Sequence, residues 1–127
     1  MTDRRDTEQL LRELHAARVE GQLARLCAVF AEDATFRIAG SSEGKAIAIA
    51  ASGLEEIRPW LAMLVKTFRL TQYEPSPSVI EGQRAMIHWR AHIHSKITGA
   101  VVATELVDMV EVRNGRIGSY FELFVPR

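Results

Sequence analysis

The sequence lacks several features that would place it in a specialised class of protein. Its single cysteine, Cys27, cannot form a disulfide within the chain, which fits a reducing compartment. No apolar stretch reaches the roughly 18 residues that a membrane-spanning helix needs. The charged residues at the start are not followed by the apolar core of a signal peptide. We therefore expect a cytoplasmic protein with no membrane partner.

The chain also lacks a net charge, because 16 basic residues balance 16 acidic ones. Such a chain has no overall positive field that would favour nucleic acid. Repeats, low-complexity tracts and internal linkers are absent, and 127 residues suit one compact domain. We predict a single domain over residues 1–127 with no nucleic-acid partner.

The first half of the chain is patterned for helices. Apolar residues spaced by three and four predict a helix that ends at Gly21, a short second helix over residues 23–30, and a third over residues 55–68. Pro59 conflicts with the third helix, so we expect a kink or a later start there. Residues 34–39 should form a strand, and residues 46–50 a short strand or a flap.

The second half is patterned for strands. Residues 84–97, 100–113 and 116–125 alternate between apolar and polar, with turn residues at Thr98-Gly99 and Asn114-Gly115. Three long antiparallel strands joined by tight turns make a meander. Helices followed by such a sheet predict an α+β fold, in which the sheet wraps round the third helix and leaves a pocket between them.

Two carboxylates interrupt these apolar strands. Asp108 lies within Thr104–Val110, and Glu122 lies within Tyr120–Phe124. A carboxylate is costly to bury unless it is paired, protonated or used. Two of them on adjacent strands predict a polar spot in an apolar cavity, with a raised pKa. The alternative is that the acids pair with an arginine of the neighbouring strand or lie on a wet sheet face.

The order of local signatures resembles the NTF2-like superfamily, in its SnoaL-like and ketosteroid-isomerase-like branch. The matching segments span nearly the whole chain: Gly21 with residues 23–30, residues 30–36, Gly53 with Ile57, Arg58 and Trp60, residues 108–117, and residues 122–124. The resemblance implies a conical barrel of a curved antiparallel sheet wrapped around the N-terminal helices, with a deep pocket. It also implies a homodimer packed through the outer sheet face. The fold hosts enzymes, binders and transport factors alike.

Two enzyme groups of this superfamily offer site residues by resemblance. In the steroid isomerases, the tyrosine position falls on Leu14, the general-base position on Ile38, and the oxyanion acid on Asp108. Because the first two are apolar here, steroid isomerisation by that mechanism is not expected. In the limonene-epoxide hydrolases, the Arg-x-Asp motif and the further acid correspond to Arg90-Ala91-His92 and to Glu122. Glu122 or His92 could then act as base towards a water oriented by Arg90.

The strand register decides which of these residues meet, because a slip of one residue turns a whole strand over. A two-residue turn at 98–99 would direct Arg90 and His92 away from Asp108, whereas a three-residue turn would bring them to its side. We leave this open. At 114–115 we favour a turn with a bulge, which puts Glu122 and Asp108 on one face, since the resemblance places both acids in the cavity.

The remaining candidates concern metal binding and the pocket walls. His88, His92 and His94 share a strand face, but Arg90 in the same row would repel a cation, so we expect no metal and no cofactor. Apolar and aromatic side chains form the walls of small-molecule sites. The candidate substrate-binding residues are Leu14, Phe30, Ile38, Trp60, Leu106, Tyr120 and Phe124.

We predict a protein that binds a small hydrophobic molecule, such as a polyketide, a terpenoid or a steroid-like compound. If it is an enzyme, the chemistry is cofactor-free acid–base work: isomerisation, cyclisation, dehydration or hydrolysis. Asp108 would donate or accept a proton, Glu122 would act as base, and Arg90 with His92 would orient substrate or water. The alternative is a non-catalytic ligand-binding or dimerisation module.

Overall fold

Three helices and a strongly curved sheet make up the computed structural model, which describes residues 4–126. The helices are α1 (Arg4–Glu20), α2 (Leu23–Ala28) and α3 (Leu54–Lys66). The strands are β1 (Phe30–Ser42), β2 (Lys45–Ser52), β3 (Phe68–Pro75), β4 (Val79–Glu81), β5 (Arg84–Ser95), β6 (Val101–Arg113) and β7 (Arg116–Phe124). The predicted α+β class is confirmed.

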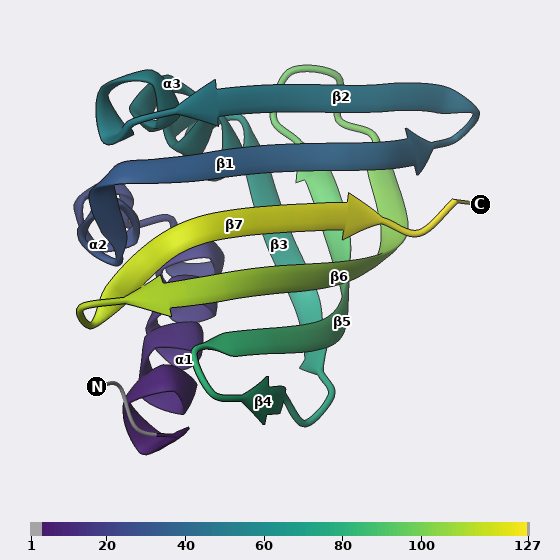
Figure 1. Ribbon diagram of the computed structural model, residues 1–127. Coiled ribbons are helices and arrows are strands. Elements are labelled where there is room, and N and C mark those ends of the chain that lie inside the picture. Colours follow the sequence, from purple (N-terminus) through teal and green to yellow (C-terminus); the bar gives the residue numbers. More distant parts are fainter. Residues whose placement is uncertain (1–3, 127) are drawn as a thin grey trace.

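The strands form one sheet in the order β2-β1-β7-β6-β5-β3, with β4 added beside β5. All neighbours are antiparallel except β1 and β7, which run parallel. In Figure 1 the sheet crosses the front as β2, β1, β7 and β6 and then curves behind as β5 and β3, with the helices inside the curve. Gly40 permits the close β1–β7 pairing, because a Cβ there would lie 2.2 Å from the Phe124 carbonyl oxygen.

The predicted elements are recovered, with differences in their bounds. The meander of β5, β6 and β7 is confirmed, whereas the first strand is longer than residues 34–39 and the 46–50 segment is part of β2. The third helix begins at Leu54, five residues before Pro59, so a later start at the proline is wrong. One lost hydrogen bond does not prevent this helix, because Ile57, Leu61 and Leu64 bury its apolar face in the core.

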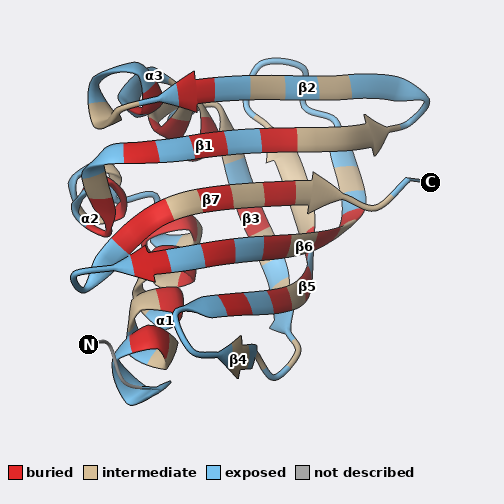
Figure 2. Ribbon diagram, viewed as in Figure 1, coloured by how far each residue is buried: buried red, intermediate tan, exposed pale blue. Residues whose placement is uncertain are grey.

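The core lies between the helices and the inner face of the sheet. Figure 2 shows buried residues alternating with exposed or half-buried ones along β5, β6 and β7, as expected of a sheet that is covered on one side. Large buried side chains include Phe30, Phe36 and Tyr120, whose rings lie 5.5 to 6.2 Å apart. Polar residues on the same inner face are therefore enclosed by apolar neighbours.

The connection between β6 and β7 sets the face that each β7 side chain takes. Asn114 and Gly115 have φ of 51° and 77°, which fits a two-residue hairpin turn. Beyond the turn the pairing shifts by one residue, and Gly118 is the extra residue on β7. The shift places Asp108 directly opposite Glu122. The expected bulge is confirmed, although it lies within β7 and not in the turn.

The connection between β5 and β6 is longer than either turn considered above. The Ser95 N–H donates to the Ala100 carbonyl at 2.9 Å, so residues 96–99 form the turn. Ile87 consequently lies opposite Asp108. A four-residue turn pairs the same strand faces as a two-residue turn does. Arg90 and His92 therefore point away from Asp108, which the sequence had left open.

Candidate functional site

Two acidic side chains meet on the inner face of the sheet. Asp108 of β6 and Glu122 of β7 are cross-strand partners, and each is 0% exposed. Their positions follow from strand alternation, since Leu106 and Val110 on the same face of β6 are also buried. Both carboxylates therefore face the helices and not the solvent.

Helix α1 supplies a partner for each acid. His15 Nε2 lies 2.8 Å from Asp108 Oδ2, and the Arg18 guanidinium donates to Glu122 Oε2. His15 and Arg18 are three positions apart, so they share one helical face. Both are buried, with side-chain exposures of 2% and 4%. A buried ion pair of this kind requires good geometry to offset the loss of hydration.

The Tyr120 hydroxyl lies between the two acids. It is 2.5 Å from Glu122 Oε2 and 3.1 Å from Asp108 Oδ2. One hydroxyl carries one proton, so it donates fully to only one carboxylate at a time. If one of the two carboxyl groups is protonated, it can donate its own proton to the Tyr120 oxygen, while the Tyr120 hydroxyl donates to the other carboxylate. We call His15, Arg18, Asp108, Tyr120 and Glu122 the inner cluster.

Aromatic rings enclose the helix side of the inner cluster. His15 Nδ1 lies 2.5 Å from the Tyr73 hydroxyl, and its ring centroid is 4.8 Å from that of Trp89. The Arg18 guanidinium carbon lies 5.1 Å from the Trp89 ring centroid, within the range of a cation–π contact. These contacts fix the rotamers of both helix residues.

Burial shifts the proton affinity of the groups in this cluster. It raises the pKa of the Glu122 carboxyl, which Arg18 opposes and the Asp108 charge reinforces. Burial, together with the two carboxylates, raises the pKa of the Tyr120 hydroxyl well above its ordinary value. Burial alone would lower the pKa of the Arg18 guanidinium, but its electrostatic attraction to Glu122, Tyr120 and Asp108 and its hydrogen bond to Glu122 together outweigh this effect, and the pKa rises. Arg18 therefore stays charged, and Tyr120 stays a donor.

Several atoms of this region have no hydrogen-bond partner among the described residues. They are the donors Arg18 Nε and Trp89 Nε1 and the acceptors Asp108 Oδ1 and Glu122 Oε1, all buried. Each carboxylate thus uses one oxygen for two contacts and leaves the other without any. An unpaired buried polar group costs about 1–3 kcal/mol, so such groups mark places where a further polar partner would be stabilising.

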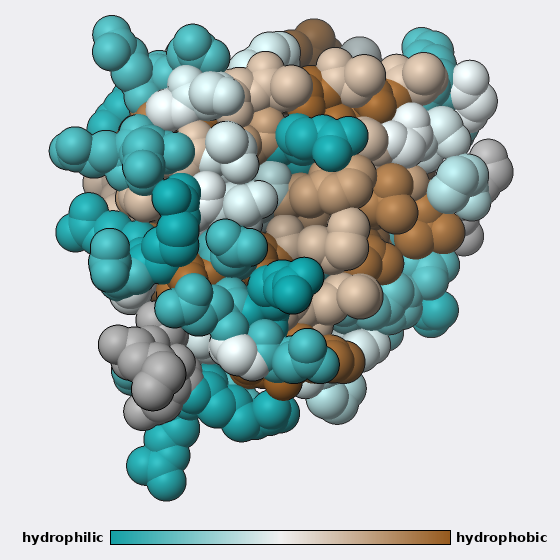
Figure 3. Space-filling view, viewed as in Figure 1, coloured by the Kyte–Doolittle hydropathy of each residue, from teal (hydrophilic) through white to brown (hydrophobic). Residues whose placement is uncertain are grey.

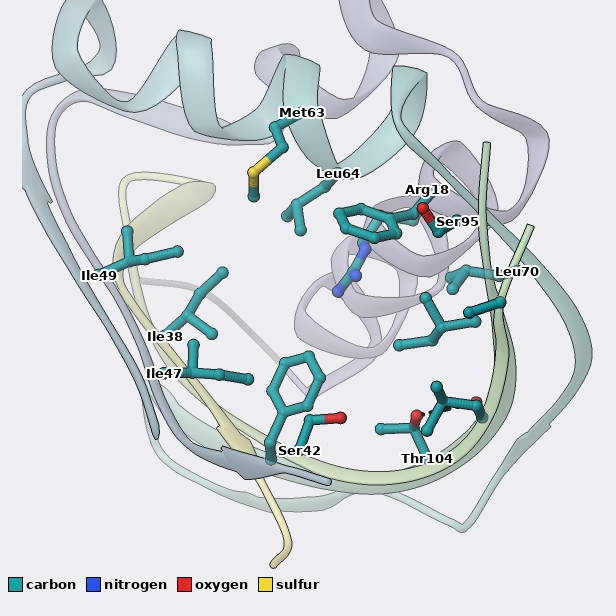
Figure 4. Close-up of a pocket in the computed structure, with 15 residues that line it drawn as sticks. Arg18, Ile38, Ser42, Ile47, Ile49, Met63, Leu64, Leu70, Ser95 and Thr104 are labelled. Atoms are coloured by element: carbon teal, nitrogen blue, oxygen red, sulfur yellow. Dashed lines mark hydrogen bonds between the residues drawn. The ribbon is translucent and has the colours of Figure 1, made fainter. Parts of the chain in front are cut away.

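A cavity of about 300 Å³ lies beside the inner cluster, between α3 and the sheet. Its lining is mainly apolar, with three hydroxyl residues and one charged residue, Arg18: Arg18, Ile38, Ser42, Ile47, Ile49, Met63, Leu64, Phe68, Leu70, Ile93, Ser95, Ala100, Val102, Thr104 and Phe124. Figure 4 shows the Arg18 guanidinium projecting from α1 towards the space that these side chains enclose. The inner cluster therefore reaches the cavity through Arg18.

Only some of the residues that were expected to form the pocket wall line the cavity. Ile38 and Phe124 line the cavity. Leu14, Phe30, Leu106 and Tyr120 lie instead in the closed core, because helix α1 and the aromatic packing cover them. Trp60 is half-buried on α3, and the next turn of that helix, with Met63 and Leu64, takes the wall position.

Arg90 and His92 are not brought to the acids. The β5–β6 register directs Trp89 and Ala91 inward, so Arg90 and His92 occupy the opposite face of β5. Arg90 is 62% exposed and lies 3.9 Å from Glu105 on that outer face. The prediction that groups Arg90 and His92 with Asp108 and Glu122 is therefore corrected, because neither residue lies beside these acids. The guanidinium next to the acids is that of Arg18 on α1.

Neither Arg18 nor His15 was identified as a site residue from the sequence. A signal for both was present, because they follow Leu11 and Leu14 at spacings of four, which puts all four residues on one helical face. A charged residue within an apolar helical stripe indicates a buried partner elsewhere in the fold.

Neither a cluster of metal ligands nor a membrane-spanning helix is found in the described part of the chain. Within residues 4–126, no three His, Cys, Asp or Glu side chains group as ligands for a metal ion. Among the same residues, no helix combines the length and the apolar character that crossing a membrane demands.

Comparison with solved structures agrees on the fold. A proposed isomerase from Bacillus subtilis superposes with a TM-score of 0.83 at 19% identity, covering 98% of this chain and 89% of that one. An NTF2-like protein from Burkholderia xenovorans gives a TM-score of 0.78 at 22% identity, covering 98% and 92%. An LEH-like epoxide hydrolase from M. tuberculosis gives 0.73 at 12% identity, covering 94% and 82%. At these identities the likeness establishes the fold alone.

The sequence itself carries the family assignment. No curated protein matches it, but residues 11–120 match the family model of the SnoaL-like domain. That range contains α1 from Leu11 onward with Arg18, all of β6 with Asp108, and β7 as far as Tyr120. The chain therefore belongs to the SnoaL-like family and has the NTF2-like fold.

Proposed function

We propose that this protein binds a small, largely apolar molecule in the cavity between α3 and the sheet. The observation that carries the proposal is the wall of that cavity, which is built from aliphatic and aromatic side chains around one cation. A volume of about 300 Å³ is at the lower end of ligand pockets, which supports a compact ligand of one or a few rings.

A thermal-shift screen with compact apolar compounds tests this proposal. Binding to the folded state should raise the Tm, and above the Kd the shift should grow with the logarithm of the ligand concentration. Ile49→Trp should fill the cavity and abolish the shift, because Ile49 lines it from β2. Ala48→Trp is the matched control, since Ala48 is exposed on the same strand. A flat screen, or equal shifts in both variants, would contradict binding at this place.

We propose cofactor-free acid–base chemistry as the second candidate function. Its support is the inner cluster, where burial raises the pKa of Glu122 and one Tyr120 proton serves two carboxylates. Raised carboxyl pKa values occur at functional sites more often than elsewhere. A ¹³C NMR titration of the carboxyl carbons should find the pKa of Glu122 well above the roughly 4 of a free acid. An ordinary value for Glu122 would favour the non-catalytic binding module.

We further propose a homodimer that packs through the outer sheet face. Val79, Met86 and Met109 support it, because they are 67%, 45% and 36% exposed and lie opposite one another on β4, β5 and β6. Figure 3 shows apolar side chains gathered on this face of the molecule. Sedimentation should give a dimer that Met86→Lys with Met109→Glu converts to a monomer; a wild-type monomer would refute the proposal.

A further inference from the structure

Arg18 lines the cavity and has donor capacity that the described residues leave unused. Its guanidinium donates to Glu122, while its Nε has no partner among the described residues, and its side chain is 4% exposed. It is also the one charged residue in the cavity wall within the described part of the chain. A buried donor in this position gains most from an acceptor atom supplied by the occupant of the cavity.

The charges around Arg18 decide what kind of acceptor fits. Glu122 already matches the guanidinium charge, and Asp108 adds a second carboxylate on the neighbouring strand. An anionic ligand would bring a further negative charge into this buried region, where repulsion is weakly screened. A neutral acceptor avoids that repulsion, and it also keeps the rest of the ligand free to pack against aliphatic walls.

We propose that the ligand is an uncharged carbonyl compound whose oxygen accepts a hydrogen bond from Arg18 while its carbon skeleton fills the apolar cavity. This inference rests on the proposed binding function and specifies its ligand class. Arg18 is then the residue that orients the ligand, and Glu122 holds the guanidinium in place. Trp89 supports it from the other side, 5.1 Å from ring centroid to guanidinium carbon. The arrangement also polarises the carbonyl, as positioned donors do in enzymes that stabilise an oxyanion.

Three probes built on the same bicyclic ring system separate the contributions: β-tetralone with a carbonyl, tetralin with no oxygen, and the corresponding tetralin carboxylate. Calorimetry on the full chain should rank β-tetralone first, with about tenfold or greater preference over tetralin, as a hydrogen bond from a charged donor gives. The carboxylate should bind more weakly than β-tetralone.

The infrared stretch of the bound carbonyl reports the hydrogen bond directly. In the wild type it should lie below its value in an apolar solvent. The double variant Arg18→Met with Glu122→Met removes donor and partner together, so that no unpaired charge is left in the core. In this variant the stretch should return to the apolar-solvent value, and the preference for β-tetralone over tetralin should disappear. Arg18→Lys, which keeps the charge, serves if the double variant does not fold, and its carbonyl stretch should move.

The outcomes separate the two proposals. Equal affinities for β-tetralone and tetralin with an unshifted carbonyl would overturn the Arg18 inference and leave apolar binding intact. Tightest binding of the carboxylate would overturn the requirement for a neutral ligand. Failure of all three probes to bind would overturn the proposed function and the inference with it.

Discussion

Charged side chains gather on both faces of strands β5 and β6, in opposite surroundings. On the outer face, His88 lies 2.5 Å from Glu105, with both side chains about a third exposed, and Arg90 is nearby at 62% exposure. On the inner face, Asp108 pairs with His15 of α1, and neither side chain is more than 2% exposed. The residue types are nearly the same, so the two groups differ mainly in the water around them.

This contrast shows that residue type alone does not locate a site. Exposed ion pairs contribute about 0–1 kcal/mol, because water and salt screen them. Buried ones exchange a large hydration free energy for a few directed contacts, so removing one partner is costly. Substitutions in the inner cluster should therefore change stability by several times more than substitutions on the outer face.

The largest effect is expected from Arg18→Met. It leaves the Glu122 carboxylate buried without its counter-charge, and we expect a loss of about 3–5 kcal/mol in the free energy of unfolding at pH 8. Urea unfolding followed by tryptophan fluorescence measures it. Adding Glu122→Met should restore most of the loss, since the uncompensated charge is then gone. A single-variant loss under 1 kcal/mol would mean that the pair is solvated.

A smaller loss is expected from Tyr120→Phe. The variant removes the hydroxyl that lies between Glu122 and Asp108 while keeping the ring that packs against Phe36. Leaving a buried carboxylate with one contact fewer should cost about 1–3 kcal/mol. Equilibrium unfolding gives the value, and Ser76→Ala, which removes a hydroxyl from His88 on the outer face, is the matched comparison. Equal losses in both variants would erase the difference between the faces.

Glu122 should also give the inner face a characteristic pH dependence. Burial raises its pKa in the folded protein, so the folded state keeps a proton that the unfolded state has released. The stabilisation is therefore complete below the unfolded value of about 4.3 and is lost as the pH rises through the folded pKa. Relative to Glu122→Gln, the wild type should gain stability as the pH falls from 8 to 5. A constant difference across this range would contradict the raised pKa.

The smallest effect is expected from Arg90→Met on the outer face. Arg90 is exposed and lies 3.9 Å from Glu105, so we expect a change within about 1 kcal/mol. The same unfolding assay measures it, and ligand binding in the cavity should be unaffected. A loss comparable to that of Arg18→Met would return Arg90 to the list of candidate site residues.

The sequence predicted the parts of the fold that local pattern controls. Alternating residues and the Asn114-Gly115 turn predicted the meander, and the apolar neighbours of Asp108 and Glu122 predicted their inward direction. The parallel pairing of β1 with β7 was not predicted, because it joins segments about 80 residues apart and no local signal records it.

The candidate site was predicted only in its acidic half. The turn over residues 96–99 carries no residue pair that fixes its length, so the direction of Arg90 was open until the register was known. Arg18 was missed because its partner, Glu122, is more than a hundred positions away in the chain, and the spacing on α1 identifies its face without identifying what it meets.

The extra residue at Gly118 gives insertions and deletions here an unusual consequence. Removing it would place Ser119 directly after Ile117, so the hairpin would pair without a bulge and every later side chain of β7 would keep its face and its partner on β6. Pairing the full sequence without the bulge would instead put Phe121 opposite Asp108, turn Glu122 to the solvent face and leave the Arg18 guanidinium without its counter-charge. A codon lost at position 118 should therefore leave the inner cluster intact, and a one-residue gap there in the sequence alignment of a relative is compatible with the same arrangement of side chains.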